Sequence, residues 1–176
     1  MGRASSRERI LDGYQEILID SGSAAVTLDA VAARAGVSKG GLLYHFGSKE
    51  ALLDGLLDRL VRLTAADIEH AGSAPEGVVQ YYLRSSVADA SMDKPAHRAA
   101  VAALRLLGSE PKVAEAMFEA GRLWSDLLAE HLDDPLTAEL VGLIGDGLYL
   151  RATMGGGAEQ PLLAQLPEAM RRLGAR

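Results

Sequence analysis

Several polar side chains between residues 27 and 49 have the chemistry needed to contact nucleic acid. Lys39 could donate to a guanine edge or to a phosphate, and Lys49 could pair with a phosphate. The hydroxyl of Thr27 could bond a phosphate, and Tyr44 and His45 carry polar tips suited to a phosphate or a base. Plainer interpretations stay open: Lys39 as a solvated surface lysine, Thr27 as a helix cap alone, and one of the two rings packed inward.

The residues around these side chains predict two short helices joined by a tight turn. Thr27 is suited to cap the first helix and Ser38 to cap the second. Gly36 stands where a helix commonly ends in a left-handed residue. Apolar residues recur at helical spacing in both segments: Leu28, Val31, Ala32 and Ala35, then Leu42, Leu43 and Phe46. Two helices joined by a turn that contains glycine are typical of a helix-turn-helix, which we place at residues 27–46.

The neighbouring segments complete a small helical head. Upstream, apolar residues form one face of a helix that ends near Gly22: Ile10, Leu11, Tyr14, Ile17 and Leu18. Downstream, Ser48 caps a further helix with Glu50 in its first turn. Residues 1–50 are therefore predicted to fold as three packed helices that form a DNA-binding domain and lead into a fourth helix.

At this point the chain resembles a known family. The segments 35–40 (AGVSKG), 44–46 (YHF) and 48–52 (SKEAL) are similar to the helix-turn-helix of the TetR (tetracycline-repressor) family of transcription regulators. The similarity covers about residues 7–60. It implies a homodimer built from the last two helices, with the second helix of the motif in the major groove. The predicted DNA-contacting residues are Thr27, Ser38, Lys39, Gly40, Gly41, Tyr44, His45 and Lys49.

The motif also departs from the family pattern. Leu43 stands where the family usually has an aromatic residue, most often a tyrosine that touches a phosphate. Tyr44 is one position further along, about 100° around a helix. Gly40 and Gly41 each cost about 1 kcal/mol of helix stability relative to alanine, but they let a backbone approach DNA closely.

Charge is divided unevenly along the chain. The net charge is −6, yet residues 1–50 hold six basic and six acidic side chains, so all the excess acid lies in residues 51–176. A neutral head lacks the basic patch common in DNA-binding domains. We therefore expect phosphate affinity from individual basic residues at the helix ends.

Composition is that of a helical globular protein. Hydrophobic residues make up 48% of the 176 residues and charged residues 24%, and aromatic residues make up only 5%. The absence of cysteine excludes disulfides and thiolate metal sites and fits a reducing compartment. The N-terminus has no signal-peptide core, and no apolar run reaches the length of a membrane span. A cytoplasmic protein without a membrane partner is expected.

The rest of the chain predicts a larger helical domain over residues 51–176. Proline and glycine breaks separate helices expected at about 75–90, 95–107, 111–132, 136–154 and 161–173. With the head, this gives an all-α fold of about nine helices and no sheet.

The helix expected at 136–154 is apolar around most of its circumference, which indicates burial. Another subunit could supply the covering surface, and we predict a homodimer interface at Leu140, Leu143, Ile144, Gly147 and Leu148. The alternative is a central core helix in a monomer.

Aromatic and methionine side chains could line a pocket for a small-molecule effector. The candidates are Tyr82, Met117, Phe118, Trp124 and Tyr149, and ordinary core packing is the alternative for each. His70, His97 and His131 stand alone, so no metal site or cofactor is expected.

These patterns favour a ligand-responsive transcription regulator over an enzyme, because no nucleophile–base pair or phosphate-binding loop occurs in the sequence. The most direct hypothesis is a repressor that leaves a palindromic operator when a small molecule binds the C-terminal domain. The alternative is a helical adaptor that binds protein and has a degenerate DNA-binding head.

Overall fold

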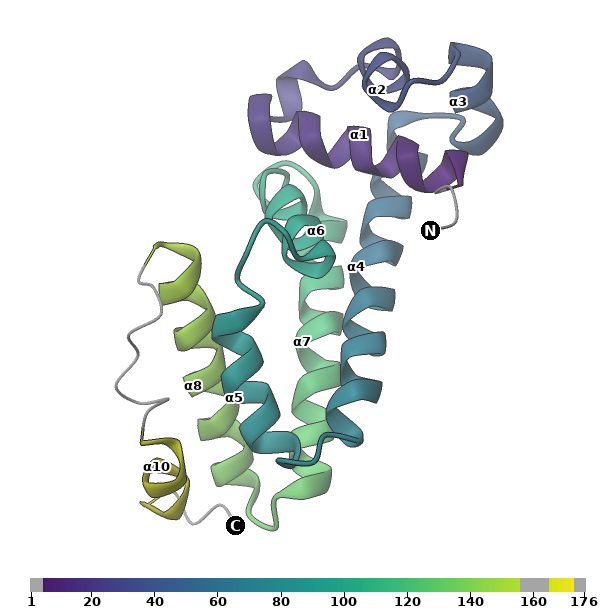
Figure 1. Cartoon of the computed structure of the whole chain (residues 1–176). Helices are drawn as coiled ribbons and strands as arrows, with labels where there is room; N and C mark the ends of the chain where they lie inside the picture. The colour runs from purple at the N-terminus through teal and green to yellow at the C-terminus, as the bar shows by residue number, and fades with distance from the viewer. Residues whose placement is uncertain (1–4, 156–164, 173–176) are drawn as a thin grey trace. The chain divides into compact units, whose positions relative to one another are not determined.

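The computed structural model describes residues 5–155 and 165–172, and in these residues all regular secondary structure is helical (Figure 1). The α-helices are α1 (Ser6–Ser21), α2 (Leu28–Ala35), α3 (Lys39–His45), α4 (Lys49–Gly72), α5 (Val78–Ala88), α6 (Pro95–Leu104), α7 (Pro111–His131), α8 (Pro135–Thr153) and α10 (Leu166–Arg172), with a 3-10 turn η1 (Ser23–Ala25) after α1. The all-α prediction is confirmed. No helix in this part of the chain is long and apolar enough to cross a bilayer.

The chain divides into two compact units. Unit 1 consists of Met1–Arg62 with Arg98–Met117, and unit 2 consists of Leu63–His97 with Phe118–Arg176. The divisions fall inside α4, α6 and α7. Unit 1 thus combines the predicted head with residues 98–117 of the predicted second domain.

The core of unit 1 lies where α1, α2, α3 and the start of α4 meet. Its largest fully buried side chains come from each of these helices: Ile10, Leu11, Leu18, Val31, Leu42, Leu52 and Leu56. The hydroxyl of Ser5 accepts from Glu8 N and caps α1. Phe46, which is also buried, ends α3 by donating its N–H to Leu42 O at 2.8 Å. The apolar face predicted from residues 10–18 is therefore the face that packs against the helix-turn-helix.

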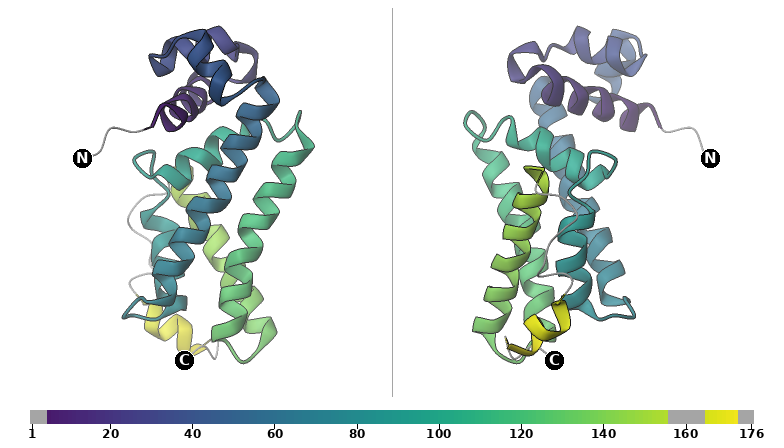
Figure 2. Two further views of the ribbon diagram at one scale, coloured as in Figure 1. Left: turned by 90° about the vertical axis from the view of Figure 1, so that its right-hand side faces the viewer. Right: turned by 60° about the vertical axis from the view of Figure 1, so that its left-hand side comes forward.

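The core of unit 2 is built on α5 and α8, which lie side by side (Figures 1 and 2). Buried residues of both helices meet Leu128 of α7, and the cluster consists of Val78, Val79, Tyr82, Leu83, Leu128, Leu132, Ala138, Val141 and Leu148. Gly145 allows the closest approach, because a Cβ there would overlap the ring of Tyr82. A glycine in the middle of α8 is thus explained by the tyrosine ring that occupies the place of its side chain.

Some helix ends differ from the prediction. α5 begins at Val78, and Gly77 before it has φ 85°, outside the helical region. α6 ends at Leu104, and turns follow it up to Ser109. Of the helix expected at 161–173, residues 166–172 are helical, and residues 161–164 and 173 lie outside the described residues.

Candidate nucleic-acid interface

The turn between α2 and α3 has the predicted geometry. The hydroxyl of Thr27 accepts from Ala30 N at 3.0 Å and caps α2. Gly36 has φ 63° and ψ 39°, the left-handed conformation that glycine adopts at little cost. Val37 N then donates to Ala32 O at 3.0 Å, which closes the C-terminus of α2 and turns the chain toward α3.

One buried residue anchors α3 and leaves most of its surface outward. The hydroxyl of Ser38 accepts from Gly41 N at 3.0 Å, and Leu42 is fully buried. Leu43 is 43% exposed and Tyr44 is 85% exposed. His45 is exposed as well, and its ring packs edge-on against the Tyr44 ring at 5.0 Å between centroids. Neither ring packs inward, so both predicted contact residues remain on the surface.

Lys39 is not simply solvated. Its Nζ lies 3.0 Å from Oδ1 of Asp29, and both side chains are more than half exposed. An exposed pair of this kind contributes about 0–1 kcal/mol, so a phosphate can compete with Asp29 for the ammonium group. The pair joins the first turn of α2 to the first turn of α3.

The two glycines of α3 have different surroundings. A Cβ on Gly40 would have no neighbour within 4 Å, whereas one on Gly41 would lie 3.3 Å from the Ser38 hydroxyl oxygen. Neither glycine has a positive φ. Gly41 therefore makes room for the cap of its own helix, and Gly40 leaves a bare patch on the outward side of α3.

The first turn of α4 carries charges of both signs. Lys49 is exposed, and the Ser48 hydroxyl accepts from Ala51 N at 3.2 Å. The pKa of the Glu50 carboxyl is lowered by a hydrogen bond from its own backbone N–H and, next, by one from the Ser48 hydroxyl. A phosphate at this helix end would meet the Lys49 ammonium group but also the Glu50 carboxylate.

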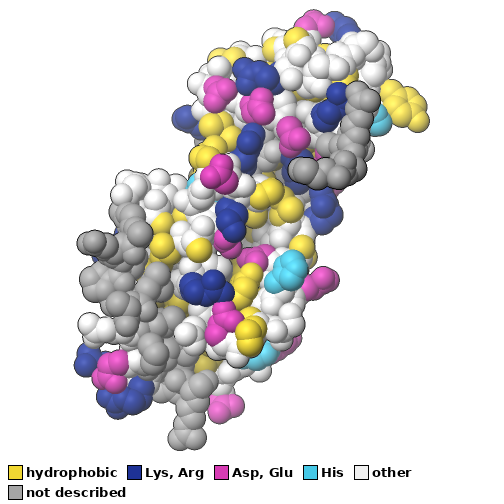
Figure 3. Space-filling model, viewed as in Figure 1, with side chains coloured by type: hydrophobic (Ala, Val, Ile, Leu, Met, Phe, Trp, Pro, Cys, Tyr) yellow, Lys and Arg dark blue, Asp and Glu magenta, His cyan; other side chains and the backbone are white. Residues whose placement is uncertain are grey.

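On the face drawn in Figure 3, basic and acidic side chains are interspersed over unit 1 and form no continuous basic patch. This agrees with the neutral charge of residues 1–50. Any attraction of this face to DNA therefore depends on where single basic side chains lie.

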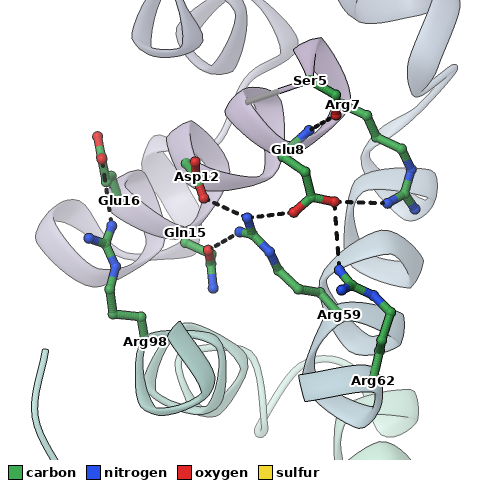
Figure 4. A network of polar contacts seen from close by, with 9 residues as sticks. All are labelled: Ser5, Arg7, Glu8, Asp12, Gln15, Glu16, Arg59, Arg62 and Arg98. Atoms are coloured by element: carbon green, nitrogen blue, oxygen red, sulfur yellow. Dashed lines mark hydrogen bonds and ion pairs between the residues drawn. The ribbon is translucent and has the colours of Figure 1, made fainter. Parts of the chain in front are cut away.

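A polar network inside unit 1 holds α1 in place (Figure 4). Arg59 of α4, whose side chain is 10% exposed, lies 2.8 Å from Glu8 and 2.7 Å from Asp12, and it also donates to Gln15, which is buried. The guanidinium group thus contacts three successive turns of α1. Arg62, one turn further along α4, adds a longer contact of 3.6 Å to Glu8.

A second part of this network joins α1 to α2 and α6. Glu16 lies 3.3 Å from Arg34 of α2 and 3.5 Å from Arg98 of α6. Arg105 donates to Ile19 O at 3.0 Å. Sequence reasoning did not relate these residues to one another. The available signal was the acidic spacing Glu8, Asp12, Glu16, which places one carboxylate on each turn of α1.

The predicted pocket residues do not form one group. Tyr82 is buried, lies 4.9 Å from Trp124 between ring centroids, and donates its hydroxyl to Gly142 O at 3.1 Å. Tyr149 pairs instead with His97, with 2.6 Å between its hydroxyl oxygen and Nδ1. Tyr82 belongs to the buried core of unit 2, and Trp124 packs against that core.

Phe118 differs from the other predicted pocket residues in its exposure. It is 79% exposed, whereas Trp124 on the same helix is partly buried against the core of unit 2. Six residues correspond to about 240° around a helix, so the two side chains face different directions. Met117, the fifth predicted residue, is half-buried and belongs to unit 1.

The predicted dimer face of α8 is divided between surface and core. Leu140 and Leu143 are 40% and 61% exposed. Gly147, which lies closer to the C-terminal end of the helix, is exposed as well. They belong to a stripe of exposed residues one helical turn apart: Leu136, Leu140, Leu143, Gly147, Leu150 and Met154. Leu148, in contrast, is 5% exposed and lies in the core of its own unit, with Ile144 packed against that core. Leu148 is thus corrected to a core residue, because α5 covers its side of α8.

Among the described residues, no group of three or more histidine, aspartate or glutamate side chains is placed to hold a metal ion. His97 is 5% exposed, and burial lowers its pKa.

Both parts of the chain match families of known proteins. Residues 10–56 match the family of bacterial regulatory proteins described as the tetR family, and residues 76–175 match the tetracyclin repressor-like C-terminal domain. The HTH-type transcriptional regulator BetI of Burkholderia thailandensis is 29% identical over 167 residues, which cover 88% of this chain and 85% of that protein.

Solved structures of other proteins are similar to this chain over nearly its full length. A transcriptional regulator of Streptomyces coelicolor A3(2) superposes with a TM-score of 0.71 at 27% identity, covering 97% of this chain and 98% of that one. The multidrug binding protein EbrR, solved with malachite green, has a TM-score of 0.73 at 25% identity with the same coverage of both chains.

Proposed function

The chain belongs to the TetR family of bacterial regulatory proteins and is a transcription regulator, not an enzyme; from this premise we propose that it is a repressor released from DNA by a small molecule. Two copies bind a palindromic operator, each through its head, the proposed DNA-binding domain of residues 1–50. A ligand bound in residues 51–176 favours a conformer whose heads no longer match the operator. The protein acts in the cytoplasm, where the operator is.

The observation that carries the proposal is the outward surface of α3. A left-handed Gly36 and the hydroxyl cap of Ser38 start the helix, and Leu42 anchors it. Lys39, Tyr44 and His45 of the same helix are exposed to solvent. A short helix held in this way can enter a major groove about 12 Å wide, with its side chains against base edges and phosphates.

The exposed apolar stripe of α8 supports a homodimer. An apolar row along one face of a helix, from Leu136 to Met154, is an unusual surface for a monomer. A two-fold axis at this face would pair two heads, as a palindrome with half-sites about 34–36 Å apart requires.

The effector is proposed only as a small molecule. A structural neighbour is a multidrug binding protein solved with malachite green, which supports a ligand site in the C-terminal part of this chain. The ligand must bind one conformer more tightly than the other, because equal affinity for both would shift nothing.

The test begins with selection from random DNA, followed by binding measurements on the enriched sequence. A palindrome should be enriched, and Lys49→Ala should weaken its binding and lower the slope of log affinity against log salt by about one for each head. Ala129→Gly, an exposed site on α7, serves as a matched control that leaves binding unchanged. A folded dimer that enriches no sequence at low salt would overturn the proposal and favour the protein-binding adaptor.

A further inference from the structure

The outward side of α3 is unusually apolar for a surface that reads DNA. Leu43 and Tyr44 are both exposed, and among the described residues 5–62 no other large hydrophobic side chain is exposed. Single exposed leucines are ordinary in soluble proteins. Here, however, the two exposed apolar side chains of the head are adjacent on its groove-facing helix.

Leu43 is 43% exposed, and the local geometry leaves part of its side chain without cover from its own helix. Side chains in a helix lean toward its N-terminus, so the Leu43 side chain lies over the preceding turn. That turn holds Gly40, which has no side chain, and the space where its Cβ would be is open to 4 Å. The methyl groups of Leu43 are therefore accessible from outside over a bare stretch of backbone.

Few free hydrogen-bonding side chains precede Leu43 in α3. Gly40 and Gly41 contribute none from side chains, and the ammonium group of Lys39 lies 3.0 Å from Asp29. The first turn of α3 therefore offers base pairs few free hydrogen-bond donors, and the polar tips of Tyr44 and His45 come only after Leu43. The major groove offers one strongly apolar feature, the C5-methyl group of thymine, which aliphatic side chains contact.

We infer that Leu43 reads a thymine methyl group once in each half-site of the operator. The inference rests on the proposed DNA-binding function and adds the chemistry of one operator position. Gly40 contributes by its lack of a side chain, since it lets both the helix backbone and the Leu43 methyl groups come close to the base edge. If Leu43 contacted a sugar instead, it would add affinity without sequence preference. The test distinguishes this outcome from contact with a thymine methyl group.

The test replaces thymines of the selected operator with deoxyuridine, one symmetric pair at a time, which removes the methyl group and keeps every hydrogen bond. For the wild-type protein, one such replacement should weaken binding about fourfold per half-site and about fifteenfold for both, the scale of burying one methylene-sized group. Leu43→Ala should bind the thymine and deoxyuridine operators equally. Tyr44→Phe is the matched control and should keep the full difference.

The results separate the inference from the function on which it rests. If no replacement weakens wild-type binding, or if Leu43→Ala keeps the same thymine preference, the inference is overturned while operator binding stands. If the folded protein enriches no sequence at all, the proposed function fails and this inference fails with it. Circular dichroism of Leu43→Ala should match the wild type, because the side chain is exposed in the free protein.

Discussion

The ammonium group of Lys39 lies 3.0 Å from the carboxylate of Asp29, ten residues earlier in the chain, on the surface that we propose faces DNA. In this pair the carboxylate of Asp29 holds the ammonium group of Lys39, which is therefore not free to contact phosphates. Because both side chains are more than half exposed, the pair adds little to folding. Its effect should appear in DNA binding.

Asp29→Asn should tighten binding to the operator and to unrelated DNA, on the order of fivefold at low salt, the equivalent of roughly 1 kcal/mol for one charge pair near a solvated surface. The change removes a negative charge and releases Lys39. Fluorescence anisotropy at increasing salt measures it, and the gain should fade as salt screens the charges. Lys39→Ala should weaken binding. If Asp29→Asn binds no more tightly than the wild type, Asp29 does not restrain Lys39.

Arg59→Met should destabilise the protein by on the order of 2 kcal/mol, between the cost of losing an exposed pair and that of losing a fully buried one. Arg59 is 10% exposed and contacts Glu8, Asp12 and Gln15, so its loss leaves the buried amide of Gln15 without that donor. Urea unfolding gives the free energy of unfolding.

The matched control is Arg62→Met, on the same helix. The Arg62 side chain is 61% exposed and its contact to Glu8 is 3.6 Å long, so the loss should stay below about 0.5 kcal/mol. Equal stability of the two variants would contradict the view that the guanidinium group of Arg59 holds α1 to α4.

Much of the head could be predicted from sequence because its signals are local. The caps at Thr27 and Ser38 and the turn at Gly36 are each determined by a residue type and its immediate neighbours. The buried Leu42 followed from helical spacing. The family match at residues 10–56 agrees with the resemblance seen in these same segments.

Contacts between distant segments could not be predicted in the same way. The Lys39–Asp29 pair depends on how the turn aligns two helices, and the Glu16–Arg98 pair joins residues that a sequence pattern does not relate. On α8, a nearly continuous apolar sequence gave no sign of which side meets α5, so Leu148 was assigned to the wrong surface. Such assignments need the packing partner as well as the helix.

Acid should destabilise the protein in part through His97. Burial lowers the pKa of His97 below its usual value of 6.5, so the unfolded chain binds a proton more readily than the folded one. The stability that depends on a neutral imidazole is fully present above pH 6.5. It is lost as the pH falls toward the pKa of His97 in the folded protein, by at most about 1.4 kcal/mol per pH unit. Unfolding measured at pH 7.0 and 5.5 gives the loss.

His97→Gln is the control for this pH dependence, because glutamine does not titrate. Its free energy of unfolding should fall less between the two pH values than that of the wild type, whatever its stability at pH 7.0. Tyr149→Phe tests whether the Tyr149 hydroxyl contributes to this pH dependence. It removes the hydroxyl that lies 2.6 Å from Nδ1 of His97 but keeps the imidazole that titrates. An equal fall in wild type and His97→Gln would show that His97 does not contribute.

Leu143→Glu should separate the proposed dimer without unfolding its subunits. Leu143 is 61% exposed in the single chain and lies in the middle of the stripe from Leu136 to Met154, so a carboxylate there is hydrated in the monomer and desolvated in the dimer. Two such charges should raise the dissociation constant at least about a hundredfold, measured by sedimentation, and operator affinity should fall with it. Ala129→Glu adds the same charge at an exposed position of α7 and should leave the dimer intact. A Leu143→Glu variant that still sediments as a dimer at wild-type concentrations would show that the subunits meet elsewhere.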